Sequence, residues 1–191
     1  YNNFSRFENI KPENIKKSNS EKVILCIGYI NHIKNKIDLV EVAKSLKNTD
    51  IKIKIIYNSY DKGYIEKLNK LINKNKLQNI ILCFDKNIIL VDEISKSWLL
   101  INTSITEVSP LSLIEGISLN KIFLSYKVGN LEWFYGNITN YNMDQMIFNI
   151  NSLNNNKFFE KKLKEISTEN YLINFTRGNC KNSFIKAIEK V

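Results

Sequence analysis

The sequence has no apolar run long enough to cross a bilayer, and its cysteines are few and far apart. A membrane-spanning helix needs about 20 consecutive apolar residues, and no such segment occurs in the 191 residues. Cys26, Cys83 and Cys180 are too widely spaced for a zinc site or a disulfide framework. Because Cys26 and Cys83 lie inside apolar runs, we expect reduced thiols and a cytoplasmic protein.

The sequence also lacks an initiator Met and a signal peptide, since Tyr1 opens a polar, irregular stretch. We therefore expect residues 1–21 to be a linker that leads in from a missing N-terminal domain. Residues 22–191 are expected to form one domain, because their number and their apolar content suffice for a single core.

Basic residues outnumber acidic ones by 28 to 19, which gives a net charge of +9. Two interpretations of this charge remain open. The scattered lysines can simply be the solvated faces of helices, or they can attract phosphates of a nucleotide, an anionic membrane or a nucleic acid. A nucleic acid is the least favoured partner, because no segment places exposed aromatic residues between the lysines.

Continuous apolar runs alternate with helical patterns after residue 21, which predicts βαβ units and a parallel sheet. The predicted strands are residues 23–27, 51–57, 79–84, 98–102 and 121–126. The predicted helices are residues 37–46, 64–77, 91–97, 110–119, 143–153, 158–166 and 179–190. The fold class is therefore α/β, with a Rossmann-like parallel sheet flanked by helices and a helical C-terminal extension.

Ligands of such sheets bind at the carboxyl ends of the strands. The first strand is followed by GYINHIKNK (28–36), and the fourth by TSITEVSPLSLIEG (103–116). With Ser109 as the N-cap and Pro110 as the first helical residue, the next helix directs free N–H groups and its positive dipole end toward this edge. An anion is expected to bind there.

Two glutamates, Glu107 and Glu115, flank the start of this helix eight positions apart. Carboxylates are poor phosphate ligands but good acceptors for paired hydroxyl groups. A ligand with hydroxyls at both ends and phosphates between them, such as a nucleotide-sugar, fits this arrangement. The alternative also remains open, in which Glu107 is a helix-start charge that favours the dipole and Glu115 only faces solvent.

The block EVSPLSLIEGISLNKIFLSYKVGN (107–130) resembles the E-x7-E block of retaining glycosyltransferases of family four. ILCIGYINHIKN (24–35) is similar to the strand and lysine turn of that family, and YNNFSRF and NFTRGNCKNSFIKAIEKV are similar to its linker and its closing helix. The resemblance covers nearly the whole chain. It implies that the chain is one half of a GT-B fold, with residues 22–191 as the C-terminal, nucleotide-sugar-binding domain.

The resemblance also implies roles for individual residues. Lys34 matches the lysine that neutralises the donor diphosphate, Glu107 the glutamate that approaches the hydroxyls of the donor sugar, and Glu115 the glutamate that binds the ribose. The remaining matched positions lie in the turn after the first strand, at the helix start that faces the donor, and where the backbone contacts the base. They are Gly28, Tyr29, Ser109, Pro110, Leu111, Phe84 and Asp85.

Several positions depart from the pattern of the family. Tyr29 stands where an Arg commonly shares diphosphate binding, so that phosphate affinity would depend on Lys34. Asn35 and Asn120 replace glycines, and one residue near Lys36 looks inserted. His32, the single histidine, is expected to be a solvated or packing residue rather than a general base.

The resemblance implies the donor-binding half of an enzyme that transfers a sugar from a UDP- or GDP-linked donor with retention. The acceptor, a sugar, lipid or protein, would bind to the missing N-terminal domain, so the isolated chain should be weakly active or inactive. No resident cofactor or metal is expected, since no Asp-x-Asp motif occurs. The basic surface could contact an anionic membrane. A sugar-nucleotide epimerase and a non-catalytic nucleotide- or polyanion-binding domain remain as alternatives.

Overall fold

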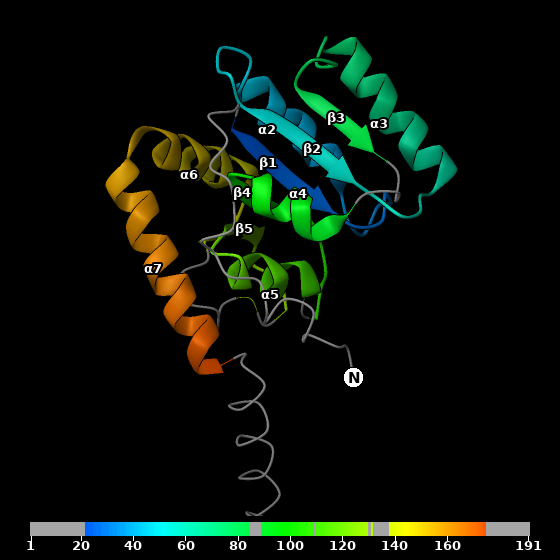
Figure 1. The fold of residues 1–191 in the computed structure, drawn as a ribbon. Helices are drawn as coiled ribbons and strands as arrows, with labels where there is room; N and C mark the ends of the chain where they lie inside the picture. Colours follow the sequence, from blue (N-terminus) through cyan, green and yellow to red (C-terminus); the bar gives the residue numbers. More distant parts are fainter. Residues whose placement is uncertain (1–21, 85–88, 109, 130, 132–137, 175–191) are drawn as a thin grey trace, which may run out of the picture.

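The computed structural model describes residues 22–84, 89–108, 110–129, 131 and 138–174. They form a parallel sheet of six strands in the order β3-β2-β1-β4-β5-β6 (Figure 1). The strands are β1 (Val23–Ile27), β2 (Lys52–Ile56), β3 (Ile81–Phe84), β4 (Leu99–Asn102), β5 (Ile122–Tyr126) and β6 (Ile138–Asn140). The predicted Rossmann-like α/β architecture is confirmed.

Helices cover both faces of this sheet. They are a 3-10 turn η2 (Lys36–Asp38), α2 (Leu39–Ser45), α3 (Lys62–Lys74), α4 (Leu90–Lys96), α5 (Leu111–Ser118), α6 (Met143–Asn155) and α7 (Lys157–Asn174). One buried cluster unites the sheet with α2, α3 and α6, and a second unites it with α4 and α5. Helix α7 packs against α6, α5 and β5 (Figure 1).

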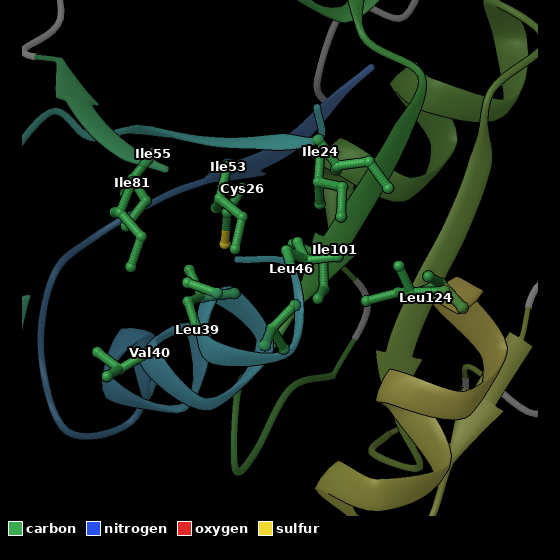
Figure 2. Packing of buried hydrophobic residues seen from close by; sticks show 14 of the residues in the cluster. Ile24, Cys26, Leu39, Val40, Leu46, Ile53, Ile55, Ile81, Ile101 and Leu124 are labelled. Carbon is green, nitrogen blue, oxygen red and sulfur yellow. The ribbon is translucent and has the colours of Figure 1, made fainter. Parts of the chain in front are cut away.

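The strands are nearly continuous apolar runs because both of their faces are buried. Ile24, Cys26 and Ile101 point toward the face that α2 covers, where Leu39 and Leu46 meet them (Figure 2). Cys26 is fully buried and lies among aliphatic side chains, as predicted for a small hydrophobic residue. The layers of the fold are therefore held together chiefly by aliphatic packing.

The strand order places the point where the chain reverses direction across the sheet between β1 and β4. From β1 the chain proceeds outward through β2 to β3, and from β4 it proceeds to the other edge through β5 and β6. The register pairs Ile24 with Leu99 and Leu25 with Leu100. The loops that follow these two strands are consequently neighbours, and such a position is the usual ligand site of open α/β sheets.

Two helices end in a Schellman motif whose left-handed residue is not a glycine. After α3, Lys76 has φ 54°, and Leu77 N donates to Ile72 O at 3.0 Å. After α5, Asn120 has φ 57°, and Lys121 N donates to Gly116 O at 2.9 Å. These bonds satisfy carbonyls at the helix ends. Asn tolerates the left-handed conformation better than most residues, which suits Asn120 to this position.

Some boundaries differ from the prediction. Strand β6 was not predicted, β3 begins at Ile81 rather than at residue 79, and α7 extends to Asn174 rather than to residue 166. The predicted helix 179–190 lies outside the described residues. None of the described helices is both long and apolar enough to pass through a membrane.

Candidate functional site

Two loops from distant parts of the sequence meet at the carboxyl edge of the sheet. The first follows β1 and contains Lys34, and the second follows β4 and contains Glu107. Ile105 N donates to Ile33 O at 2.8 Å, and Thr103 Oγ1 donates to Lys34 O at 3.0 Å. These contacts hold the two loops side by side at the point where the sheet reverses, as the strand ends predicted.

Lys34 and Glu107 form an ion pair between the two loops, in which Lys34 Nζ donates to Glu107 Oε1. The side chain of Lys34 is 29% exposed and that of Glu107 is 14% exposed. The pair is therefore shielded from much of the solvent, which strengthens the attraction between its charges, yet Lys34 remains accessible to a ligand. Two of the predicted site residues are thus in direct contact across 73 positions of sequence.

The turn that carries Lys34 has a defined shape. Lys34 N donates to the side-chain oxygen of Asn31 at 2.9 Å, and Asn35 adopts the left-handed conformation with φ 45°. The hydroxyl of Tyr64, on α3, accepts from Ile37 N at 3.2 Å and donates to Asn35 at 3.4 Å. Asn35, which the resemblance matches to a glycine, has a φ in the left-handed region, which glycine and asparagine adopt more readily than other residues do.

Lys36 does not face the ligand edge, although it lies in the same lysine turn. Its side chain is fully buried, and its ammonium group lies 3.0 Å from Cys26 Sγ and 3.4 Å from Ile27 O. Lys36 opens the 3-10 turn η2 at the position where the sequence suggested an inserted residue. The lysine turn therefore offers Lys34 to a ligand, whereas Lys36 belongs to the core.

The loop that carries Glu107 is contacted by the end of β4 and by the loop after β5. The hydroxyl of Ser104 lies 3.1 Å from Glu107 Oε1 and 2.7 Å from Asn102 Oδ1. Gly129, in the loop after β5, has φ 59°, and a Cβ atom there would come within 2.7 Å of Val108 O and closer still to Glu107 O. The V-G pair of the sequence therefore lets the loop after β5 pack directly against the backbone of Glu107.

Helix α5 begins at this edge. Its N-cap is Pro110, so the helix starts at Leu111, one residue later than predicted, and Pro110 has no side chain that could cap it. The first N–H groups of a helix have no partner within the helix, and such groups can bind an anion. Glu115 follows about one helical turn after Leu111 and is half-buried. Gly116 allows α5 to approach Leu100 of β4 closely.

The other predicted positions have different outcomes. Gly28 has φ 118°, and apart from its chain neighbours no described atom lies within 4 Å of the place where a Cβ would stand. Tyr29 is half-buried in the same turn, and His32 is exposed. Ser109 and Asp85 lie outside the described residues. The backbone of Phe84 ends β3 opposite Ile56.

The strongest described pKa shifts lie away from this site. Burial lowers the pKa of Lys121 to about 8, with Lys164 adding repulsion. Its ammonium group donates to Ser95 O and Ser97 O, both at 2.7 Å. Burial and a hydrogen bond to Asp38 raise the pKa of Tyr126. The hydrogen bonds of Lys121 therefore stabilise the end of α4, and the hydrogen bond of Tyr126 to Asp38 stabilises the start of α2.

Thr103 and Ser104 are functional candidates that the sequence analysis missed. Both are fully buried, and each contacts one of the two loops. A sequence signal does exist, because the apolar strand β4 passes into three polar residues, Asn102, Thr103 and Ser104, just before the loop. Polar residues at the carboxyl end of a buried strand are candidates for contacts with a site.

Solved structures of two glycosyltransferase-family proteins and of Anabaena HepE have the same fold. A glycosyltransferase from Rickettsia africae matches with a TM-score of 0.80 at 19% identity, over 97% of this chain and 54% of that one. Anabaena HepE, solved with UDP-glucose, matches with a TM-score of 0.74 at 12% identity, over 88% and 49%. The C-terminal domain of the group 1 protein LpcC from Francisella tularensis matches with 0.74 at 11% identity, over 88% and 99%.

The chain spans about half the length of the first two of these proteins. No curated protein matches the sequence. A profile of the glycosyl transferases group 1 family matches residues 7–169, which is most of the chain and includes both loops of the site. The chain belongs to the glycosyl transferases group 1 family.

Proposed function

We propose that the chain is the C-terminal, donor-binding half of a retaining glycosyltransferase, which transfers a hexose from a nucleotide-diphosphate donor to an acceptor. Membership of the group 1 family supports the transferase, and the E-x7-E block with its lysine turn supports the retaining class. Anabaena HepE, which shares the fold, was solved with UDP-glucose, and we expect a UDP- or GDP-linked donor here.

Each residue of the site has a part in this reaction. Lys34 binds the diphosphate and neutralises the charge that develops on it as the leaving group departs. The free N–H groups of α5, from Leu111 onward, add hydrogen bonds and a positive dipole end at the same place. Glu107 accepts from the hydroxyls of the sugar, and Glu115 accepts from those of the ribose. A metal ion is not needed for this arrangement.

The contact between Lys34 and Glu107 carries the proposal. It unites a cation suited to phosphate and a carboxylate suited to hydroxyl groups at the reversal point of the sheet. An ion pair that served only the fold could lie anywhere on the surface. This one joins the loops after β1 and β4, next to Gly28, where a Cβ atom would meet no described atom within 4 Å.

The remaining partners of the whole enzyme follow from the same proposal. The acceptor, a sugar, lipid or protein, binds to the N-terminal domain, so the isolated chain binds donor weakly and turns it over little. We also propose a cytoplasmic location with peripheral contact to an anionic membrane. The lysines of α3 support this contact, since Lys62, Lys67, Lys70 and Lys74 are all exposed.

Calorimetric titration of the chain with UDP, GDP and ADP tests the donor site. We expect saturable binding of one nucleotide, and loss of that binding in the Glu115→Ala and Lys34→Met variants. Glu41→Gln, which breaks an exposed ion pair with Lys44 on α2, is the control and should bind as the unaltered chain does. Binding that ignores Glu115 and falls steeply with salt would instead indicate a polyanion-binding domain.

A second measurement separates a transferase from an epimerase. Nucleotide-sugars are incubated with the chain without acceptor. The sugar is then identified, both the part that is still attached to the nucleotide and any part that has been released. Conversion of the donor into an epimer without acceptor would contradict the transferase. Rapid transfer by the isolated chain to a simple acceptor would contradict the assignment of acceptor binding to another domain.

A further inference from the structure

Two consecutive hydroxyl groups at the end of β4 each contact one loop of the site. Thr103 Oγ1 donates to the backbone oxygen of Lys34 at 3.0 Å, and Ser104 Oγ lies 3.1 Å from Glu107 Oε1. The two residues directly after β4 thus reach both loops. Both side chains are fully buried, which excludes bulk water as a competing partner.

The hydroxyl of Ser104 has one proton and two acceptors. Asn102 Oδ1 lies 2.7 Å away and Glu107 Oε1 lies 3.1 Å away. As long as Lys34 neutralises Glu107, the shorter bond to Asn102 is favoured. A carboxylate that has lost its ammonium partner is the stronger acceptor. Asn102 Oδ1 would then keep the backbone N–H of Ser104, which lies 3.3 Å from it.

We propose that Ser104 is a positioning residue, which turns its hydroxyl to Glu107 when Lys34 leaves to bind the donor diphosphate. This inference rests on the proposed function, because it requires Lys34 to bind phosphate. Glu107 is only 14% exposed, and a shielded carboxylate that loses its partner pays a desolvation cost. Ser104 supplies the replacement hydrogen bond and keeps Glu107 aimed at the place of the sugar.

A double-mutant cycle tests this role. The dissociation constants of UDP, GDP and ADP are measured for the unaltered chain, Ser104→Ala, Glu107→Ala and the double variant. We expect Ser104→Ala to weaken binding of the nucleotide about tenfold where Glu107 is present, as for a hydrogen bond to a charged group. In the Glu107→Ala background the same change should alter binding by less than about twofold, because no carboxylate then needs a partner.

Ser104→Cys and Ser104→Thr separate loss of the hydroxyl group from a general effect of the substitution on the fold. Cysteine has nearly the same volume but is a weak donor, so Ser104→Cys should resemble Ser104→Ala. Ser104→Thr retains the hydroxyl and should restore the affinity. Ser125→Ala is the matched control, since Ser125 lies opposite Asn102 on β5, is fully buried, and its hydroxyl has no partner among the described residues. It should bind nucleotide normally.

Each other outcome is decisive. Equal losses from Ser104→Ala in both backgrounds would show that Ser104 supports the fold alone, and no loss in either would overturn its role outright. Both results leave nucleotide binding by the unaltered chain intact, so the proposed function would survive them. Absence of nucleotide binding by the unaltered chain would overturn the proposed function, and the positioning role with it.

Discussion

Gly129 packs directly behind Glu107, with its α-carbon so near that no side chain fits between the two backbones. Its φ of 59° lies in the left-handed region, and a Cβ atom would overlap Glu107 O and approach Val108 O to 2.7 Å. The loop after β5 thus packs against the backbone of the loop that carries Glu107. A residue 22 positions downstream decides where Glu107 can stand.

Gly129→Ala should therefore displace Glu107. The left-handed conformation costs an alanine about 1–2 kcal/mol, and the overlap with Glu107 O adds to it, so the free energy of unfolding should fall by at least that amount. Binding of the nucleotide should weaken by about tenfold or more, because the displaced backbone of Glu107 and Val108 leads directly into α5, whose first N–H groups are proposed to bind the diphosphate. Denaturant unfolding and calorimetric titration measure the two effects.

Gly63→Ala is the matched control for that change. Gly63 lies in the first turn of α3, and a Cβ there would meet only Asp61 Oδ1 at 3.6 Å, which is ordinary contact. Alanine is the better helix former by up to about 1 kcal/mol. Gly63→Ala should stabilise the chain and leave binding unchanged. Equal behaviour of the two variants would exclude a special role for Gly129.

The sequence predicted the elements whose stability is local or comes from continuous burial. β1, β4 and β5 stood out because both of their faces are apolar. Strand β6 did not, since it is a three-residue strand held by pairing with β5 and by Asn140, whose side chain donates to Ser125 O at 2.9 Å. Such a long-range polar contact leaves no periodic signal in the sequence.

The candidate site divides in the same way. The rule that ligands of a parallel sheet bind at the carboxyl ends of its strands was enough to predict that the loops with Lys34 and Glu107 share an edge, and the two residues form an ion pair. The burial of Lys36 against Cys26 and the bond of Ser104 to Glu107 were not predictable. Both depend on the direction of a single side chain, which the pattern of residue types does not determine.

Lys76→Gly should stabilise the chain. Lys76 occupies the left-handed position of the Schellman motif after α3, with φ 54°, and only glycine adopts this conformation without cost. We expect the free energy of unfolding to rise by about 1 kcal/mol, measured by urea denaturation. Lys70→Gly, at an exposed position inside the helix, is the control and should destabilise instead. A loss of stability from Lys76→Gly would mean that the side chain of Lys76 contributes more than its strain costs.

Lys121 should make stability depend on pH in the alkaline range. Burial lowers its pKa in the folded chain to about 8, against an ordinary value of 10.5. Between pH 8 and pH 10.5 the unfolded chain binds more protons than the folded chain does, so the free energy of unfolding increases as the pH rises. This gain is absent below pH 8 and complete above pH 10.5.

The measurement is the difference in unfolding free energy between the unaltered chain and Lys121→Met, taken from pH 7 to pH 10.5. The comparison removes the contribution of the other groups that titrate in this range. The difference should shift in favour of the unaltered chain by about 1–3 kcal/mol as the pH rises. A difference that stays flat would show that Lys121 keeps its ordinary pKa despite its hydrogen bonds to Ser95 O and Ser97 O.

Glu107→Gln should bind a free nucleoside diphosphate more tightly than the unaltered chain does. In the structure Lys34 is already paired with Glu107, so a diphosphate must compete with the carboxylate for the ammonium group. Glutamine has nearly the same shape without the charge, and it also removes repulsion between Glu107 and the phosphates. We expect a gain of about three- to tenfold, or about 1 kcal/mol, by calorimetric titration with the nucleotide that the chain prefers.

The same competition would help to expel the product. After transfer the sugar no longer contacts Glu107, and the carboxylate can reclaim Lys34 from the diphosphate. Glu107→Gln should therefore release the nucleotide more slowly, which stopped-flow displacement measures. Glu41→Gln, whose exposed partner Lys44 lies on α2, should change neither quantity. Weaker binding in Glu107→Gln would mean that Glu107 holds Lys34 in its binding position rather than competing for it.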